Sequence, residues 1–313
     1  MAGITSCIIT YMKLCEKQKR LAANTLRAYN IDMRQFTDFL KEKGIESVEA
    51  SEITKEILKV YIDRLQEQYA PRSFKRKVAS IKAFFNHLEF EDEILVNPFR
   101  KMRIKIKESK ELPKVIKKHE ISLQLNHAYQ QAAGAKTAYQ QFYSARMVAC
   151  YELLVNTGMR VGELCRLTMD AIDFDNGSVR IWGKGSKERI VYITSEVAMK
   201  SLQCYRQLRE QLSTPSNYFF INWRRNRMRE DAVRSYIRRI ADELLKKRIT
   251  PHMFRHTFAT MLLEKQVDIS YIQALLGHSS IKTTQIYLHL CNASIRDVLI
   301  KARLRDEFSF QSI

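Results

Sequence analysis

Apolar residues recur at helical spacing through the first hundred positions, and this periodicity limits the possible folds more than any other feature of the chain. In NTLRAYNIDMRQFTDFL, apolar side chains at positions 29, 33, 36 and 40 fall on one face of a helix. Two further runs, over residues 57–65 and 74–88, repeat the pattern. We therefore predict that the first part of the chain is built from helices.

The second part carries one clear β signal within otherwise helical sequence. In AIDFDNGSVRIWGKGSKERIVYIT, apolar and polar residues alternate on either side of DNGS and GKGSKE, which are both typical of turns. The stretch predicts a small three-stranded antiparallel sheet. The expected fold class is therefore mainly α with a small antiparallel β-sheet.

A stretch bracketed by prolines, NPFRKMRIKIKESKELPK, separates the two parts. Basic residues alternate with isoleucine in its RIKIK segment, which is compatible with a strand. The flanking prolines instead favour an extended basic linker. We place the domain boundary in this stretch, which gives a helical first domain over residues 1–96, the linker over residues 97–114 and a second domain over residues 115–313.

The charge of the chain points to a polyanionic partner. Its 53 Lys and Arg residues exceed its 34 Asp and Glu residues, for a net charge of +19 over 313 residues. Such a field favours nucleic acid over a membrane surface, although a generally basic protein is the alternative. Basic residues cluster in PRSFKRK, in the linker and beside Trp223. For the arginines beside Trp223, a solvated helical face is an equally consistent interpretation. The residues that we expect to face DNA phosphates are Arg72, Lys75, Arg76, Lys77, Arg103, Lys105, Arg224 and Arg225.

The cysteine pattern and the hydropathy indicate in which cellular compartment the protein is found. Six cysteines are scattered without a C-x-x-C pair, which argues against a zinc ribbon or a disulfide framework and is typical of a reducing cytosol. No apolar run approaches ~18 residues, and the apolar start lacks the basic leader of a signal peptide. We expect a cytoplasmic protein with no membrane span.

The segment TPHMFRH is the first candidate for chemistry. Thr250 and Pro251 are typical of a helix start, which puts His252 and Arg255 on one face near the N-terminus, where backbone amides favour an anion. His252 and His256 could chelate a metal, but the segment lacks the glutamate of H-E-x-x-H, and no third ligand is close. A phosphate fits better, so we expect no metal and no cofactor.

Three other segments add candidates that are weak when taken singly. In NTGMRVGEL, Arg160 falls in the first turn of a helix, where its fork suits two phosphate oxygens. Taken alone, an arginine at this position would more often form a surface ion pair with Glu163. In GKGSKER, glycines flank Lys184 in a turn that could simply be a hairpin tip. The segment LLGHSSIKTTQIY supplies His278 and Tyr287.

The order TGMRVGEL, GKGSKER, HMFRHTFAT, LLGHSSIKTTQIY resembles that of the tyrosine recombinases, also called phage-type integrases. The separations also fit, with 24 residues from Arg160 to Lys184 and nine from His278 to Tyr287. The resemblance implies a SAM-like helical core-binding domain and a mixed α+β catalytic domain that close around double-stranded DNA. At this size the chain resembles the Xer-type recombinases and the minimal integrases of transposons.

The resemblance also carries the catalytic roles of the family to this sequence. Tyr287 is then the nucleophile that forms a 3′-phosphotyrosine, which keeps the bond energy for resealing. Arg160, Arg255 and His278 would stabilise the charge of the transition state. His252 would act as the base, and Lys184 would protonate the departing 5′-hydroxyl. The expected catalytic residues are Arg160, Lys184, His252, Arg255, His278 and Tyr287.

The resemblance also implies a homotetramer on two DNA duplexes that exchanges strands through a Holliday junction, and it leaves open whether a sister recombinase or an accessory protein takes part. An apolar stripe at Ile295, Val298 and Leu299 predicts a terminal helix that docks either on its own domain or on a neighbour. The alternatives are a type IB topoisomerase and a catalytically silent DNA-binding protein on the same fold. The sequence leaves open whether the product is integration, excision, inversion or dimer resolution.

Overall fold

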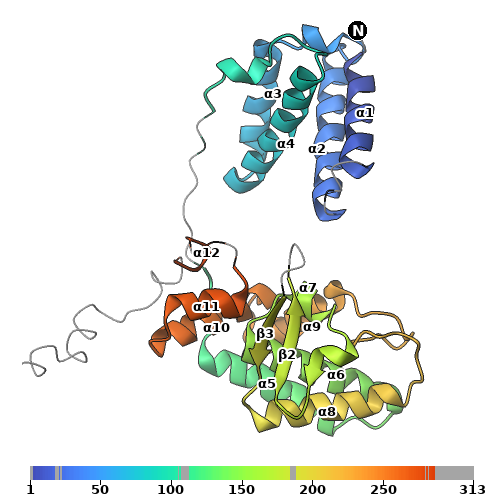
Figure 1. Ribbon diagram of the computed structural model, residues 1–313, viewed down its shortest axis with the longest axis vertical. Helices are drawn as coiled ribbons and strands as arrows, with labels where there is room; N and C mark the ends of the chain where they lie inside the picture. The colour runs from blue at the N-terminus through green and yellow to red at the C-terminus, as the bar shows by residue number, and fades with distance from the viewer. Residues whose placement is uncertain are drawn as a thin grey trace, which may run out of the picture. The chain divides into compact units, whose positions relative to one another are not determined.

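The structure, a computed structural model, describes residues 3–17, 21, 23–104, 106, 113–183, 188–278, 280 and 282–285. The chain divides into two compact units, Met1–Lys110 and Glu111–Ile313 (Figure 1). Among the described residues, no helix is both long and apolar enough to cross a bilayer.

The first unit is helical, as its periodicity predicted. Phe36, Tyr61 and Phe85 come from three different helices and are buried in one core. The ring centroid of Phe36 lies 5.1 Å from that of Tyr61 and 6.1 Å from that of Phe85. The elements are α1 (Ile4–Lys17), α2 (Ala23–Glu42), the 3-10 helix η1 (Ala50–Glu52), α3 (Lys55–Gln68), α4 (Pro71–Phe90) and the 3-10 helix η2 (Pro98–Lys101).

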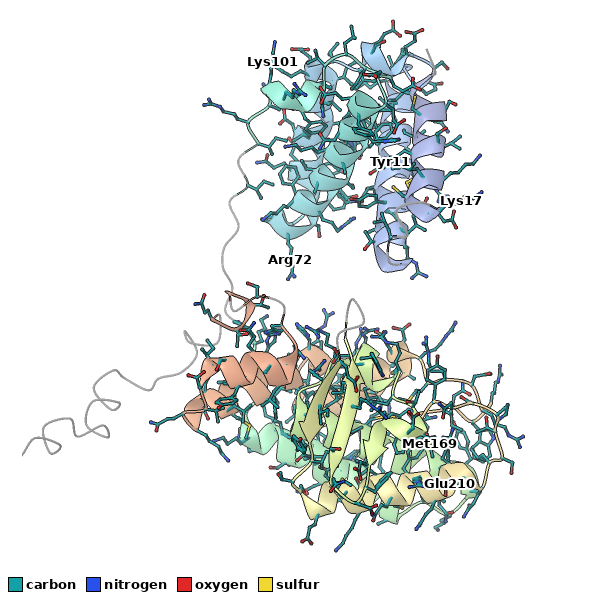
Figure 2. All side chains as sticks on the ribbon, in the orientation of Figure 1. Tyr11, Lys17, Arg72, Lys101, Met169 and Glu210 are labelled. Atoms are coloured by element: carbon teal, nitrogen blue, oxygen red, sulfur yellow. The ribbon has the colours of Figure 1, made fainter. Side chains whose placement is uncertain are left out.

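A buried carboxylate organises the basic start of α4. Asp32 is 1 % exposed and accepts hydrogen bonds from Arg76 and Ser80, while Lys77 lies 3.0 Å from it and is itself buried. The expectation that Lys77 faces DNA is therefore wrong, because leaving Asp32 unpaired in the core would be strongly destabilising. Arg72 differs, since it points away from the unit at the first turn of α4 (Figure 2).

The segment expected to be an extended linker is in part folded. Asn97 caps η2 by accepting a hydrogen bond from the backbone of Phe99 at 2.9 Å, and Phe99 is buried. Met102, Ile104 and Ile106 pack against the core of the first unit. The alternating apolar residues thus cover that core, and this part of the stretch belongs to the first unit.

The second unit is built around α6, which is buried along most of its length and packs against α5, α8 and α10. The helices are α5 (Lys118–Ala133), α6 (Ala138–Thr157), α7 (Val161–Leu164), the 3-10 helix η3 (Met169–Ala171), α8 (Glu196–Glu210), α9 (Glu230–Leu245), α10 (Pro251–Glu264), α11 (Ile269–Leu276) and α12 (Lys282–Gln285).

The predicted antiparallel sheet is confirmed, with strand order β1 (Ile172–Asp173), β2 (Ser178–Trp182) and β3 (Glu188–Tyr192). Val179 pairs with Val191, and Ile181 pairs with Arg189. Val179, Ile181 and Val191 are buried in the core of the unit. Because side chains alternate along a strand, Arg189 lies on the same inward face as Val191.

Candidate functional site

Arg255 is the most deeply buried member of the predicted set. Pro251 starts α10 after Thr250, as expected, and Arg255 is 1 % exposed. Its Nη1 donates to the carbonyl of Gly158 at 3.0 Å, and its Nη2 donates to the carbonyl of Leu276 at 2.6 Å. These carbonyls lie at the C-terminal ends of α6 and α11, where the helix dipole favours a cation.

Two glycines allow these helix ends to approach the arginines. Gly158 (φ +58°) and Gly277 (φ +63°) both adopt the left-handed conformation that ends a helix. A Cβ at Gly158 would lie 2.5 Å from the ring of Phe258, and one at Gly277 would lie 3.0 Å from Nη1 of Arg189. Both positions favour glycine by conformation. In addition, a Cβ at Gly158 would clash with Phe258, and one at Gly277 would crowd Arg189.

Arg160 lies at the N-cap of α7 and is paired with Glu163, as one reading of the sequence expected. Its Nη1 donates to Oε1 of Glu163 at 2.8 Å. Arg189 donates to both oxygens of the same carboxylate, at 3.1 and 2.7 Å. Burial alone would raise the pKa of Glu163, but the bonds from Arg189 and Arg160 hold it below its ordinary value. The side chain of Arg160 remains 39 % exposed, and this pair uses one of its five donors.

Arg189 is a site residue that the sequence reasoning missed. Besides Glu163, it bonds through Nε to the carbonyl of Leu275 at 2.8 Å. It thereby ties β3 to α7 and to the end of α11. The signal was present, because alternation puts this arginine on the inward face of the strand, where a charge requires a buried partner.

Three histidines surround these arginines. His252 is exposed in the first turn of α10, and its ring centroid lies 4.5 Å from that of His256. Burial, followed by Arg255, Arg160, Arg189 and His252, lowers the pKa of His278 to about 4. Burial and the neighbouring His252 and Arg255 likewise lower the pKa of His256 to about 4. Both rings are therefore neutral at neutral pH.

The structure brings together four of the six predicted catalytic residues, because Arg160, His252 and Arg255 all lie close enough to His278 to lower its pKa. The other two, Lys184 and Tyr287, lie outside the described residues, as does Lys105 of the predicted DNA-facing set. Among the described residues, no group of three His, Cys, Asp or Glu side chains could hold a metal ion. The predicted DNA-facing residues that the structure finds exposed are Arg72, Lys75, Arg76, Arg103, Arg224 and Arg225.

The depressed pKa values of His256 and His278 predict that the protein loses stability below pH 6.5. In the unfolded chain both rings titrate near 6.5, so between pH 6.5 and 4 the unfolded state binds more protons. Stability therefore rises with pH through this window, and these two groups leave it flat above. We expect the temperature at the midpoint of unfolding to decrease as the pH is lowered from about 6.5 to 5, and to decrease less in a His256→Asn/His278→Asn variant. The same dependence of the midpoint temperature on pH in both proteins would contradict the assignment.

The sequence matches the Phage integrase family over residues 114–293 and its N-terminal SAM-like domain over residues 8–92. A tyrosine recombinase of Agathobacter rectalis is 40 % identical over 99 % of this chain and 100 % of its own length. The tyrosine recombinase XerC of Oceanobacillus iheyensis is 31 % identical over 95 % of this chain and 96 % of its own.

The fold is also that of a solved relative. The XerH site-specific recombinase, in a post-cleavage complex with a palindromic difH substrate, superposes with a TM-score of 0.73 over 94 % of this chain and 83 % of its own, at 21 % identity. The family match spans more than half of the chain, and the relatives align along almost all of it. The chain therefore belongs to the phage integrase family and is a site-specific tyrosine recombinase.

Proposed function

We propose that this protein cuts double-stranded DNA by forming a covalent bond between Tyr287 and a 3′-phosphate, and rejoins the ends after strand exchange through a Holliday junction. The reaction takes place on cytoplasmic DNA and uses neither metal nor cofactor. The observation that carries the proposal is the cluster of Arg160, Arg255 and His278, in which both guanidiniums lie close enough to the neutral imidazole of His278 to lower its pKa.

This cluster has the composition that phosphoryl transfer to a tyrosine requires. A phosphodiester gains negative charge as it reaches its pentavalent transition state, and fixed donors stabilise that charge without reorganising. The guanidinium of Arg255 is held by two carbonyls, and that of Arg160 is held by Glu163, so both are positioned before DNA arrives. We assign both arginines and His278 to the phosphate, His252 to the proton of Tyr287, and Lys184 to the departing 5′-hydroxyl.

Charge supports a DNA surface on both units. Arg72, Lys75 and Arg103 are exposed on the first unit, and Arg224 and Arg225 are exposed in the loop between α8 and α9 of the second. Exposed arginines and lysines neutralise phosphates and release counterions. We infer that both units contact one duplex, and that four subunits assemble on two duplexes. The related XerH, solved on its difH substrate, supports DNA as the partner.

Covalent capture tests the proposal. Duplexes that the protein selects from a randomised library supply a binding site, and a nick beside the cleaved phosphate lets a short fragment escape. The covalent product then accumulates and appears as a protein–DNA band on a denaturing gel. A tightly bound duplex that never yields this band would contradict the proposal. Relaxation of a plasmid without any selected site would instead favour the topoisomerase alternative, and native gels on paired sites count the subunits.

Covalent capture should also resist removal of divalent ions. The charge that a metal would supply comes here from side chains, above all from Arg160 and Arg255. We expect excess EDTA to change the rate of adduct formation by less than about twofold, which is smaller than the effect of removing one fixed donor. A large decrease in the rate of adduct formation that added Mg²⁺ reverses would contradict the assignment and would favour a metal bound by His252 and His256.

A further inference from the structure

The main chain of His278 is fixed on both sides by one residue. Its backbone N–H donates to the carbonyl of Gln273 at 3.1 Å, and its own carbonyl accepts from Nε2 of Gln273 at 3.1 Å. Gly277, in the left-handed conformation, turns the chain between them at the end of α11. With the backbone fixed, the ring of His278 can change position only by rotation about its own side-chain bonds.

A threonine on the next helix contacts the ring itself. Nδ1 of His278 lies 2.9 Å from Oγ1 of Thr284, which is fully buried on α12. In the described part of the chain, this nitrogen is the hydrogen-bonding partner of the Thr284 hydroxyl. A buried hydroxyl that donates to nothing is destabilising. The O–H of Thr284 therefore donates to Nδ1, which must then be unprotonated.

This bond determines what the other ring nitrogen can do. A neutral imidazole carries one proton, so an unprotonated Nδ1 puts that proton on Nε2. Burial, together with the arginines beside the ring, keeps it neutral at neutral pH. A neutral His278 can then donate a hydrogen bond to a phosphate oxygen only through Nε2. The opposite tautomer would turn a lone pair towards the phosphate.

We propose that Thr284 is a positioning residue that holds His278 in the tautomer protonated at Nε2. Thr284 lies three residues before Tyr287, so the segment that leads to the proposed nucleophile also sets the donor on the phosphate. The use made of the Nε2 proton rests on the proposed function, whereas the tautomer itself does not.

Three variants separate the hydroxyl from the rest of the side chain. Thr284→Val keeps the shape but loses the donor, and Thr284→Ser keeps the donor. Thr283→Val makes the same change at the preceding residue of α12, which is exposed. Nitrogen NMR of the ¹⁵N-histidine-labelled protein without DNA reads the tautomer directly, with the signals of His278 assigned by their loss in His278→Gln.

We expect the wild type, Thr284→Ser and Thr283→Val to show protonated Nε2 and unprotonated Nδ1 at neutral pH. Thr284→Val should show a mixture or the opposite tautomer. A wild type protonated at Nδ1 overturns the proposal without any variant, and so does a folded Thr284→Val with the wild-type tautomer. In covalent capture, Thr284→Val should be slower by about tenfold at unchanged DNA affinity, and Thr284→Ser should be near wild type. If the wild type forms no adduct, the proposed function fails while the NMR result still decides the role of Thr284.

Discussion

Replacing Tyr287 with phenylalanine should abolish the covalent protein–DNA adduct while leaving DNA affinity within about twofold of the wild type. The substitution removes one oxygen, which is the proposed nucleophile, and neither adds charge nor changes the shape of the ring. Affinity should persist because phosphate contacts from arginine and lysine dominate binding to DNA.

Other tyrosines in the described part of the chain show why an ordinary core tyrosine cannot take this role. Burial raises the pKa of Tyr236 to about 12, and it raises the pKa values of Tyr151 and Tyr205 as well. Their hydroxyls stay protonated in the core and have no access to DNA. The matched control is Tyr271→Phe, because Tyr271 is 68 % exposed on α11 and loses the same atom. An adduct of undiminished yield from Tyr287→Phe would remove Tyr287 from the mechanism.

Replacing Arg160 with alanine should slow adduct formation by on the order of 10²–10³-fold, the usual loss when one fixed donor to a transition state is removed. The fold should survive, since Glu163 keeps both of its hydrogen bonds from Arg189. Single-turnover rates on the nicked duplex measure the effect independently of product release.

The control for Arg160→Ala should remove the same charge elsewhere on the same unit. Arg206 serves, because it is exposed on α8 and pairs with Glu210, which Figure 2 labels on the second unit. We expect Arg206→Ala to cleave at close to the wild-type rate. Equal losses in the two variants would mean that net charge, rather than a fixed donor at the phosphate, accounts for the effect of Arg160.

Features that depend on neighbours along the chain were predictable. The helices of the first unit were predicted because apolar residues recur every three or four positions along one face of each helix. Phe36 and Phe85 are buried, as that pattern required. The antiparallel sheet followed from alternation around two turns. The four described catalytic candidates were found from motifs whose order and spacing are specific.

Features that depend on distant partners were not predictable. Lys77 belongs to a basic cluster in the sequence, but its partner Asp32 lies 45 residues away and holds it in the core. Arg189 finds Glu163 at a separation of 26 residues and Leu275 at a separation of 86. No local window contains these pairs. Strand alternation could place Arg189 on the inward face, but only the folded chain shows which partners hold it there and that Lys77 is buried against Asp32.

The measurement that tests the central claim most directly is the identification of the residue and the DNA end joined in the wild-type adduct. Trypsin cuts after Lys282 and Arg296 and releases residues 283–296. Tyr287 is the single tyrosine of this peptide, which also contains threonine, serine and cysteine as other possible nucleophiles. We expect fragment masses to place the nucleotide on Tyr287, joined through its 3′-phosphate, in samples prepared with EDTA. A nucleotide on any other residue of that peptide, or one joined through its 5′-phosphate, would contradict the mechanism.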